Sequence, residues 1–370
     1  MKKQILHIAE NSTFLQSTIE LFEKYLPGMN VFLVDLDFII HKKFDYSQYN
    51  CVHLVSFKSN MYESFIEDAV NKWKVVILHN IGTQSKRLII NRLHLIVPLH
   101  GIIWGWEIYD SVKLEKLIFL PVTRQKFKPT ALSLKQKLLF FRKNIETNNY
   151  HTELEKLTSY SVVLDNEIVF LNKFYGYTKK TLKFNYPFFN NDIVFSLVKG
   201  KSVLLGNSAT PENNHLDLIP YLKNCINHID KIVIPLSYGD KNYGNQIEKI
   251  YTDEFENKIQ VLRDFISLES YSKLLDECGF LVMGHIRQQA LGNIYMGIYR
   301  GAKVFLHRKS FAYLDLKNKG FIVYDLESIE LESIKNETDE NVNINKALVQ
   351  NWFSDGVLGN YILEINKFYN

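Results

Sequence analysis

The chain alternates short β-like runs with helical patterns almost throughout, and this alternation constrains its fold more than any other feature. In the first half, two segments with apolar residues at helical spacing separate the β-like runs. Strand–helix–strand repetition implies a parallel sheet that helices cover on both faces. The expected strands are QILHIA, NVFLVDLDF, CVHLVSF and KVVILHN, and the expected helices are TFLQSTIELFEKYL and NMYESFIEDAVNKW.

The same pattern starts again near residue 200. KSVLLGNSATPENNHLDLIPYLKNC predicts a strand, a turn and a helix, and a second helix is expected to begin at Ser267. Further strands are expected in KIVIPLSYG, IQVLRDF, FLVMGH, AKVFLHR and GFIVYDL. We therefore predict an α/β chain of two Rossmann-like, doubly wound domains that face each other across a cleft. The expected parts are a first domain over 1–188, a second over 189–342, and a C-terminal helix within 343–370 that packs back on the first domain.

The composition suits a folded protein with sizeable cores. The 370 residues are 46% apolar and 14% aromatic, so long disordered segments are not expected. A net charge of +4 is only mildly basic and does not by itself indicate nucleic acid. Three cysteines without metal-ligand spacing predict free thiols in a reducing compartment. The amino terminus does not read as a signal peptide, and no apolar run reaches the roughly 18 residues of a membrane span.

Ligands of open α/β sheets bind at the carboxyl ends of the strands, so the loops there are the candidate sites. Gly206, Asn207 and Ser208 follow one expected strand and precede a helix, whose free N–H groups favour a phosphate. An ordinary capped turn is the alternative. The chain has neither a GxGxxG fingerprint nor a P-loop, so the nucleotide signal does not come from either motif.

A second candidate follows the strand FLVMGH. Arg287, Gln288 and Gln289 stand just ahead of an apolar helix, where an arginine can form paired hydrogen bonds to phosphate oxygens. Gly292 in the first turn permits close approach of a ligand, and Asn293 comes next. The alternative is a polar helix cap at the surface.

Three acidic or basic candidates lie in the first half. Glu107, among aromatic neighbours in HGIIWGWEIYD, is a candidate general base with a raised pKa, or else a salt-bridge partner beside core tryptophans. His79 ends a strand, where a structural histidine is the more common outcome. Asp35 and Asp37 form a DxD pair, but no other metal ligands cluster nearby, so we do not expect a metal site.

Residues 113–143 are densely basic and interleaved with Leu, Ile and Phe. This combination suits an anionic membrane surface, with apolar side chains entering the interface. The alternatives are a solvated basic helix and a site for single-stranded nucleic acid, for which no accompanying motif is present. The candidate membrane or acceptor contacts are Lys116, Arg124, Lys126, Lys128, Lys135, Lys137 and Arg142.

The chain resembles glycosyltransferase family 56, the 4-acetamido-4,6-dideoxy-D-galactose transferases that act on lipid II of enterobacterial common antigen. The likeness is strongest over 203–325 and includes LLGNS with Asn213 and His215, IVIPLSYG with Pro235 and Tyr238, and SYSKLLDECGFLVMGHIRQQALGNI. In the first half it includes His79 and the pattern of Trp104, Gly105, Glu107 and Tyr109. The family usually carries aspartate at the position of Glu107, and a glycine-containing loop where this chain has HIAENS.

The resemblance implies an inverting transferase of the GT-B type, which works without a bound metal or other cofactor. It would move a sugar from a dTDP-linked donor to an undecaprenyl-diphosphate-linked saccharide, as a peripheral protein on the cytoplasmic face of the bacterial inner membrane. The first domain would hold the acceptor and the second the donor. Glu107 would be the base, with Glu10 and His79 as second choices. Donor contacts would come from Gly206, Asn207, Ser208, His215, Tyr238, Arg287, Gln288, Gln289, Gly292 and Asn293.

Two functions of other kinds share the expected fold. A sugar-nucleotide 2-epimerase with two Rossmann-like domains would use the same diphosphate site but need no membrane segment. A non-catalytic module would bind the nucleotide and show no activity. Incubation of the donor without an acceptor separates them, because only the epimerase changes the sugar.

Overall fold

The computed structural model divides the chain into two compact units. Unit 1 comprises Met1–Asp110, Phe141–Asp192 and Trp352–Asn370, and unit 2 comprises Ser111–Phe140 and Ile193–Asn351. The structure describes residues 3–12, 14–39, 45–67, 69–109, 114–127, 152–187, 196–329 and 335–370.

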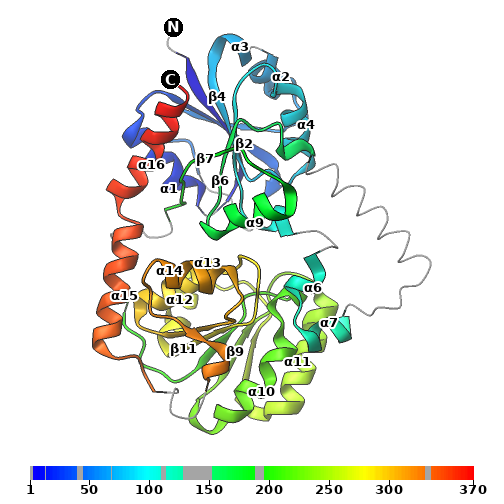
Figure 1. The fold of residues 1–370 in the computed structure, drawn as a ribbon, viewed down its shortest axis with the longest axis vertical. Helices are drawn as coiled ribbons and strands as arrows, with labels where there is room; N and C mark the ends of the chain where they lie inside the picture. Colours follow the sequence, from blue (N-terminus) through cyan, green and yellow to red (C-terminus); the bar gives the residue numbers. More distant parts are fainter. Residues whose placement is uncertain are drawn as a thin grey trace, which may run out of the picture. The chain divides into compact units, whose positions relative to one another are not determined.

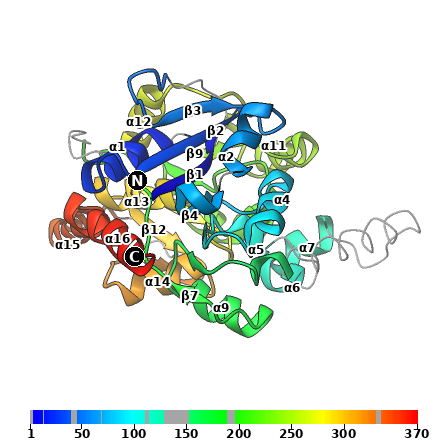
Figure 2. The ribbon, with the colours of Figure 1, turned by 90° about the horizontal axis from the view of Figure 1, so that it is seen from above.

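Unit 1 is built on a seven-stranded parallel sheet with the order β3-β2-β1-β4-β5-β6-β7. Figure 2 shows β3, β2, β1 and β4 following one another in that order. The strands are β1 Gln4–Asn11, β2 Asn30–Ile39, β3 Val52–Val55, β4 Trp73–His79, β5 Leu99–Ile102, β6 Ser159–Ser161 and β7 Lys180–Thr181. The helices are α1 Leu15–Tyr25, α2 Asn60–Glu67, α3 Ala69–Lys72, α4 Gln84–Leu93, α5 Trp106–Tyr109, α9 Asn166–Tyr175 and α16 Asp355–Phe368.

Unit 2 repeats the design with six parallel strands in the order β10-β9-β8-β11-β12-β13. The strands are β8 Val203–Leu205, β9 Ile232–Pro235, β10 Ile259–Leu262, β11 Phe280–Met283, β12 Lys303–Leu306 and β13 Tyr324–Asp325. The helices are α6 Glu115–Ile118, α7 Pro121–Phe127, α10 His215–Cys225, α11 Lys241–Phe255, α12 Leu268–Glu277, α13 Leu291–Arg300, α14 Phe311–Asn318 and, ending at the boundary with unit 1, α15 Asp339–Trp352. Short 3₁₀ turns occur at Pro211–Asn213, Ile226–His228, Glu256–Lys258 and Leu326–Ser328.

In both sheets the strand order reverses beside the first strand of the unit. The reversal lies between β1 and β4 in unit 1, and between β8 and β11 in unit 2. In a doubly wound fold the crevice at such a switch point, outside the carboxyl ends of the strands, is where ligands bind. The central strands β1, β4, β8 and β11 are almost entirely buried, as expected for parallel strands covered on both faces.

The predicted class, two doubly wound α/β domains, is confirmed, and every predicted strand is present. Strands β5, β6 and β7 were not predicted, because runs of two to four residues such as LHGI and SYS carry little periodicity. The predicted last helix is two helices, α15 and α16, separated at Phe353 and Ser354. The break is fixed because the Ser354 hydroxyl accepts a hydrogen bond from the backbone N–H of Val357 and so caps α16.

Helix α16 packs against α1 at the side of the unit 1 sheet, and both views show the two helices side by side (Figures 1 and 2). Its residues Leu358, Ile362 and Ile365 belong to the buried core of unit 1. The Tyr25 hydroxyl of α1 donates a hydrogen bond to the Asp355 backbone carbonyl at 3.0 Å. The chain therefore completes its first unit with its last helix.

Residues 114–127 lie in unit 2, whereas the sequence predicts that they belong to the first domain. The reason is a set of contacts with the first turn of α10. The carboxylate of Asp217 accepts hydrogen bonds from the backbone N–H groups of Val122 and Thr123 at 2.8 and 2.9 Å. The Asn214 side chain adds bonds to the same segment. These contacts link parts of the chain more than 90 residues apart, which local sequence patterns do not predict.

Candidate active site

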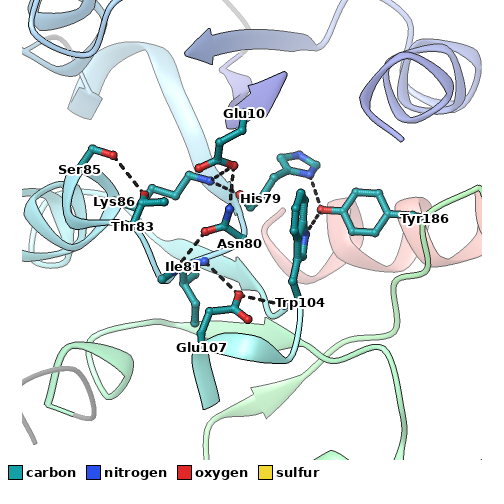
Figure 3. Close-up of polar contacts among 11 residues, drawn as sticks. Glu10, His79, Asn80, Ile81, Thr83, Ser85, Lys86, Trp104, Glu107 and Tyr186 are labelled. Carbon is teal, nitrogen blue, oxygen red and sulfur yellow. Dashed lines mark hydrogen bonds and ion pairs between the residues drawn. The ribbon is translucent and has the colours of Figure 1, made fainter. Parts of the chain in front are cut away.

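The switch point of unit 1 holds a buried cluster of polar side chains (Figure 3). Glu10 stands near the end of β1, and Asn80 follows β4. The Lys86 ammonium, fully buried in α4, pairs with Glu10 Oε2 at 2.6 Å and also donates to the His79 carbonyl. Asn80 Nδ2 donates to the same Glu10 oxygen at 2.8 Å. Glu10 therefore forms an internal ion pair, and this arrangement favours a structural role for Glu10 over a role as general base.

Glu107 lies at the start of the short helix α5, after β5, and is 4% exposed. Its Oε1 atom accepts hydrogen bonds from the backbone N–H groups of Trp104 at 2.9 Å and Ile81 at 3.4 Å. Its Oε2 atom has no hydrogen-bond partner among the residues that the structure describes. Burial raises the pKa of Glu107 to about 7, against the opposing effect of the backbone donors and Lys86. A carboxyl group with one oxygen held, the other unbonded and a pKa near neutrality fits a general base.

His79 has both of its ring nitrogens engaged. Nδ1 lies 3.0 Å from the Tyr186 hydroxyl, and Nε2 lies 3.1 Å from Nδ1 of His7. Burial, with smaller effects from His7 and Lys86, lowers the pKa of His79 well below its usual value. The Tyr186 hydroxyl also accepts from the Trp104 indole at 2.7 Å (Figure 3). The histidine thus belongs to an internal network, and these contacts favour a structural role for it.

In unit 2, the loop after β8 is shaped by Asn213. Gly206 has φ of +64°, the left-handed region that favours glycine. The Asn213 side chain accepts from the Asn207 backbone N–H at 3.1 Å and donates to the Ser208 carbonyl and hydroxyl at 3.1 and 2.9 Å. His215, at the start of α10, is fully buried, and its Nδ1 lies 2.8 Å from the Tyr243 hydroxyl. The loop is therefore preorganised by its own side chains.

A side-chain bridge joins this loop to the one after β11 across the switch point. Gln289 Nε2 donates to Asn207 Oδ1 at 2.8 Å and lies 3.2 Å from the Ser208 hydroxyl. Several buried polar atoms here have no hydrogen-bond partner within the described part of the chain: Gln289 Oε1, His215 Nε2 and both ring nitrogens of His285. Unsatisfied buried polar atoms are uncommon in folded proteins, and their gathering at one sheet edge indicates a ligand site.

The loop then leads into α13, a helix of ten residues that no side chain caps. Its N-cap residue is Ala290, which adopts a left-handed conformation with φ of +57°. Gly292 has open space where a Cβ atom would lie, and it and Asn293 are half-buried in the first turn. Arg287 and Gln288 precede the helix and are also half-buried, and the guanidinium donates to the Gln288 carbonyl at 3.0 Å. The free N–H groups and the cation suit a phosphate.

Tyr238, in the loop after β9, extends the same edge of the sheet. Its hydroxyl accepts from Asn207 Nδ2 at 2.6 Å. Its ring stacks on Phe265, which follows β10, with centroids 6.1 Å apart and an interplanar angle of 15°. Tyr238 is 45% exposed and Phe265 is 52% exposed, so the pair offers an aromatic surface beside the polar loops.

Unit 1 also contains a cavity of about 560 Å³ between α2 and α4. Its walls combine apolar and charged side chains, including Phe57, Leu88, Lys58 and Arg92, with Asp35 of β2. The volume lies within the roughly 300–1,000 Å³ that is usual for ligand pockets. Asp35 is buried, whereas the side chain of Asp37 lies outside the described residues. Within the described ranges, no group of three or more His, Cys, Asp or Glu residues is placed to hold a metal ion.

Only part of the basic segment 113–143 can be located. Lys116 and Lys126 are exposed and Arg124 is half-buried, on the short helices α6 and α7. The remaining candidates, Lys128, Lys135, Lys137 and Arg142, lie outside the described residues. Among the residues with described positions, no helix is long and apolar enough to cross a bilayer.

We expect Gly206→Ala to destabilise the protein. A Cβ atom at this position would lie 2.8 Å from His215 Nε2 and 2.9 Å from Asn213 Oδ1, in addition to the unfavourable positive φ. Strain of this kind costs roughly 1–3 kcal/mol. The measurement is chemical denaturation, with Gly292→Ala as the control, because that position has open space and no positive φ. Equal stability of the two variants would contradict the prediction.

Several residues of these sites were missed by sequence reasoning. Lys86 lies in QSKRLIINRL, whose pattern is typical of a surface helix. Asn80 has no signal of its own in the sequence beyond its place next to His79. Phe265 is the last residue of the predicted strand IQVLRDF, and this position at a carboxyl end is the one available signal for it. Asn213 was noticed only through the family resemblance.

The architecture is shared with solved glycosyltransferase structures. The glycosyltransferase from Rickettsia africae ESF-5 aligns with a TM-score of 0.62 at 12% identity, covering 100% of this chain and 98% of that chain. Anabaena HepE in complex with UDP and glucose aligns with a TM-score of 0.63 at 11% identity, covering 99% and 100%. Sucrose-phosphate synthase from Thermosynechococcus elongatus aligns with a TM-score of 0.56 at 10% identity, covering 100% and 98%. The fold is that of the GT-B glycosyltransferases.

The similarity to a known family lies in the second half of the chain. Residues 191–363 match the family model described as 4-alpha-L-fucosyltransferase glycosyl transferase group 56. This match confirms, for that part of the chain, the resemblance inferred from the sequence, and together with the fold it supports a glycosyltransferase enzyme.

Proposed function

We propose that the protein is an inverting glycosyltransferase that moves a 4-acetamido-4,6-dideoxyhexose from a dTDP-sugar to an undecaprenyl-diphosphate-linked saccharide. It would act in the synthesis of a bacterial surface polysaccharide, at the cytoplasmic face of the inner membrane. The observation that carries the proposal is Glu107, a buried carboxyl group with one oxygen held by two backbone donors and the other without a partner among the described residues. The family match and the sugar nucleotide bound to Anabaena HepE support the donor class.

The reaction is a single displacement at the anomeric carbon. The acceptor hydroxyl oxygen attacks that carbon, its proton passes to Glu107 Oε2, and the bond to the donor's diphosphate oxygen breaks. The nucleoside diphosphate leaves and the anomeric configuration inverts. The pKa of Glu107 near 7 suits this step, because the carboxylate is substantially deprotonated at neutral pH while remaining basic enough to accept the proton.

The donor would bind at the switch point of unit 2. The uncapped start of α13, the half-buried Arg287 and the loop at Gly206 would hold the diphosphate, since N–H groups and a guanidinium stabilise the charge that develops on the leaving group. The aromatic surface of Tyr238 and Phe265 would carry the base. The donor would then lie on the part of the chain that matches the family.

The acceptor would bind to unit 1, which carries Glu107. The cavity between α2 and α4 begins at the first turn of α4, two residues after Gly82, which packs against Glu107. Its mixture of apolar and polar walls suits a saccharide. In unit 2, exposed Lys116 and Lys126 would contribute to attraction toward anionic lipids.

The test is an assay with purified protein, dTDP-4-acetamido-4,6-dideoxygalactose and a polyprenyl-diphosphate-linked saccharide in anionic vesicles. We expect a glycosylated lipid of inverted anomeric configuration, detected by mass spectrometry and NMR. UDP- and GDP-linked sugars serve as competing donors. Conversion of the donor to an epimer in the absence of acceptor would overturn the proposal, as would transfer with retention of configuration.

We expect Arg287→Ala to weaken the binding of dTDP. Charge-assisted hydrogen bonds contribute roughly 1.5–3 kcal/mol, so the dissociation constant should rise by about 10- to 100-fold. Titration calorimetry with dTDP measures this directly. Lys249→Ala is the matched control, because it removes an exposed cation from α11 in the same unit. An unchanged affinity in Arg287→Ala would remove this residue from the diphosphate site.

A further inference from the structure

We propose that Asn80 is a positioning residue for Glu107, and that it fixes the turn at residues 80–82 so that one carboxylate oxygen is held and the other is left for the acceptor. This inference rests on the proposed role of Glu107 as the base. Asn80 acts through the turn and through Glu107, rather than on the reacting atoms. Three sets of contacts support this role, and Figure 3 shows the hydrogen bonds among them.

The first set holds Asn80 itself. Its backbone adopts φ of +56°, a left-handed conformation that asparagine tolerates better than most residues but that still needs support. Nδ2 donates to Glu10 Oε2 at 2.8 Å, and Oδ1 accepts from the Gly82 backbone N–H at 3.1 Å. The side chain thus ties the turn to β1 on one side and closes it on the other.

The second set links this turn to Glu107. The backbone N–H of Ile81, inside the turn, donates to Glu107 Oε1 at 3.4 Å. A Cβ atom added to Gly82 would lie 2.8 Å from Glu107 Cγ and would overlap the Trp106 ring. The turn therefore lies close against the Glu107 side chain and holds its Oε1 atom through the Ile81 N–H group.

The third set anchors the partner of Asn80. Glu10 is 2% exposed, and its Oε2 atom receives both Asn80 and the buried Lys86 ammonium. Lys86 also binds the carbonyl of His79, the residue before Asn80. The Lys86 ammonium holds Glu10 and the end of β4 together, so Glu10 Oε2 stays in position to accept a hydrogen bond from the Asn80 amide.

The titratable groups that face this part of unit 1 are Glu10, Asp35, His79, Lys86 and Tyr186.

The consequence is an oriented base. With Oε1 occupied by the backbone of Ile81 and Trp104, Oε2 remains as the atom that can take a proton. A carboxylate that is free to rotate would spend part of its time in unproductive orientations, and its backbone donors would no longer favour the charged form.

Asn80→Gly tests the proposal, because glycine accepts the positive φ while removing both side-chain bonds. We expect kcat to fall by about tenfold or more, with the KM for the dTDP-sugar unchanged. We also expect the acid limb of the pH profile of kcat to move upward by about one unit, because loss of the Ile81 donor disfavours the charged carboxylate. A merely structural role would lower stability without moving that limb.

A pair of swapped residues provides the rescue. Asn80→Asp puts a second carboxylate beside Glu10 and should lower kcat as well. Adding Glu10→Gln restores the hydrogen bond with its direction reversed, because the new amide at position 10 donates to the new carboxylate at position 80. The net charge of the pair is then the original one, so the pH profile should return toward that of the wild type. The proposal is overturned if Asn80→Gly leaves kcat and the acid limb unchanged. Full activity of Glu107→Gln, by contrast, would overturn the proposed base itself.

Discussion

Glu107→Gln is expected to lower kcat by about 10²- to 10⁴-fold, the usual effect of removing a general base. The amide has nearly the same size and can keep an oxygen facing the N–H groups of Trp104 and Ile81, so the local fold should persist. The affinity for dTDP should be unchanged, because the proposed donor residues lie in unit 2. Steady-state kinetics with lipid-linked acceptor and titration calorimetry with dTDP measure the two quantities.

The matched control for this variant is Glu67→Gln, which alters an exposed carboxylate at the end of α2 in the same unit. It should leave both constants unchanged. A fully active Glu107→Gln enzyme would exclude this residue as the base. Loss of dTDP binding in the same variant would indicate a general defect instead of a missing proton acceptor.

The pKa of Glu107 gives this variant a second signature, in stability. Burial raises the pKa from 4.5 to about 7, so between these values the folded state binds more protons than the unfolded state. Stability from this group therefore falls as pH rises from about 4.5 to 7 and is constant above that, a total change of roughly 3 kcal/mol. Glu107→Gln lacks this change, and its stability relative to the wild type should improve between pH 5 and pH 8 in urea denaturation. A pH-independent difference would contradict the raised pKa.

The second large effect is expected for Lys86→Met. The variant leaves Glu10 as a buried carboxylate without its cation, and breaking a buried pair in this way costs roughly 3–5 kcal/mol. Denaturation by urea measures the loss. Adding Glu10→Gln should recover part of it, because the unpaired charge causes most of the cost.

Lys24→Met is the matched control for Lys86→Met. Lys24 pairs with Asp355 at the surface of the same unit, where solvent screens the interaction, so its removal should have a much smaller effect. Equal losses in Lys24→Met and Lys86→Met would show that the buried pair has no special importance. If Lys86→Met and the double variant with Glu10→Gln are equally unstable, the lost stability comes from lost packing and not from the unpaired charge.

The two loops proposed to bind the donor can be predicted from the sequence, because each lies directly after a strongly apolar strand. Strand–turn–helix order places Gly206 and Arg287 at carboxyl ends, and parallel strands put those ends on one edge. The aromatic neighbours of Glu107 predict a raised pKa, and burial does raise it, whereas the role of Glu107 as the base stays a prediction. In these cases, the apolar strand that is visible in the sequence also determines where the residues that follow it lie in the fold.

The residues whose side-chain contacts hold these sites together could not be predicted from the sequence in the same way. Lys86 and Glu10 are 76 positions apart, and only the pairing of β1 with β4 brings them together. The amide of Gln289 likewise reaches Asn207 across 82 positions. Side-chain bonds between strand ends depend on strand order and register, which hydrophobic periodicity does not specify.

The docking of α16 on α1 has a consequence for biosynthesis. A chain is made from its amino end, and domains generally fold as they emerge from the ribosome. The strands of unit 2 are complete before α16 exists, whereas unit 1 needs Leu358, Ile362 and Ile365 of that helix for its core. The unit that is synthesised first is therefore the last to finish folding, and until then the part of α1 that α16 covers stays exposed to chaperones.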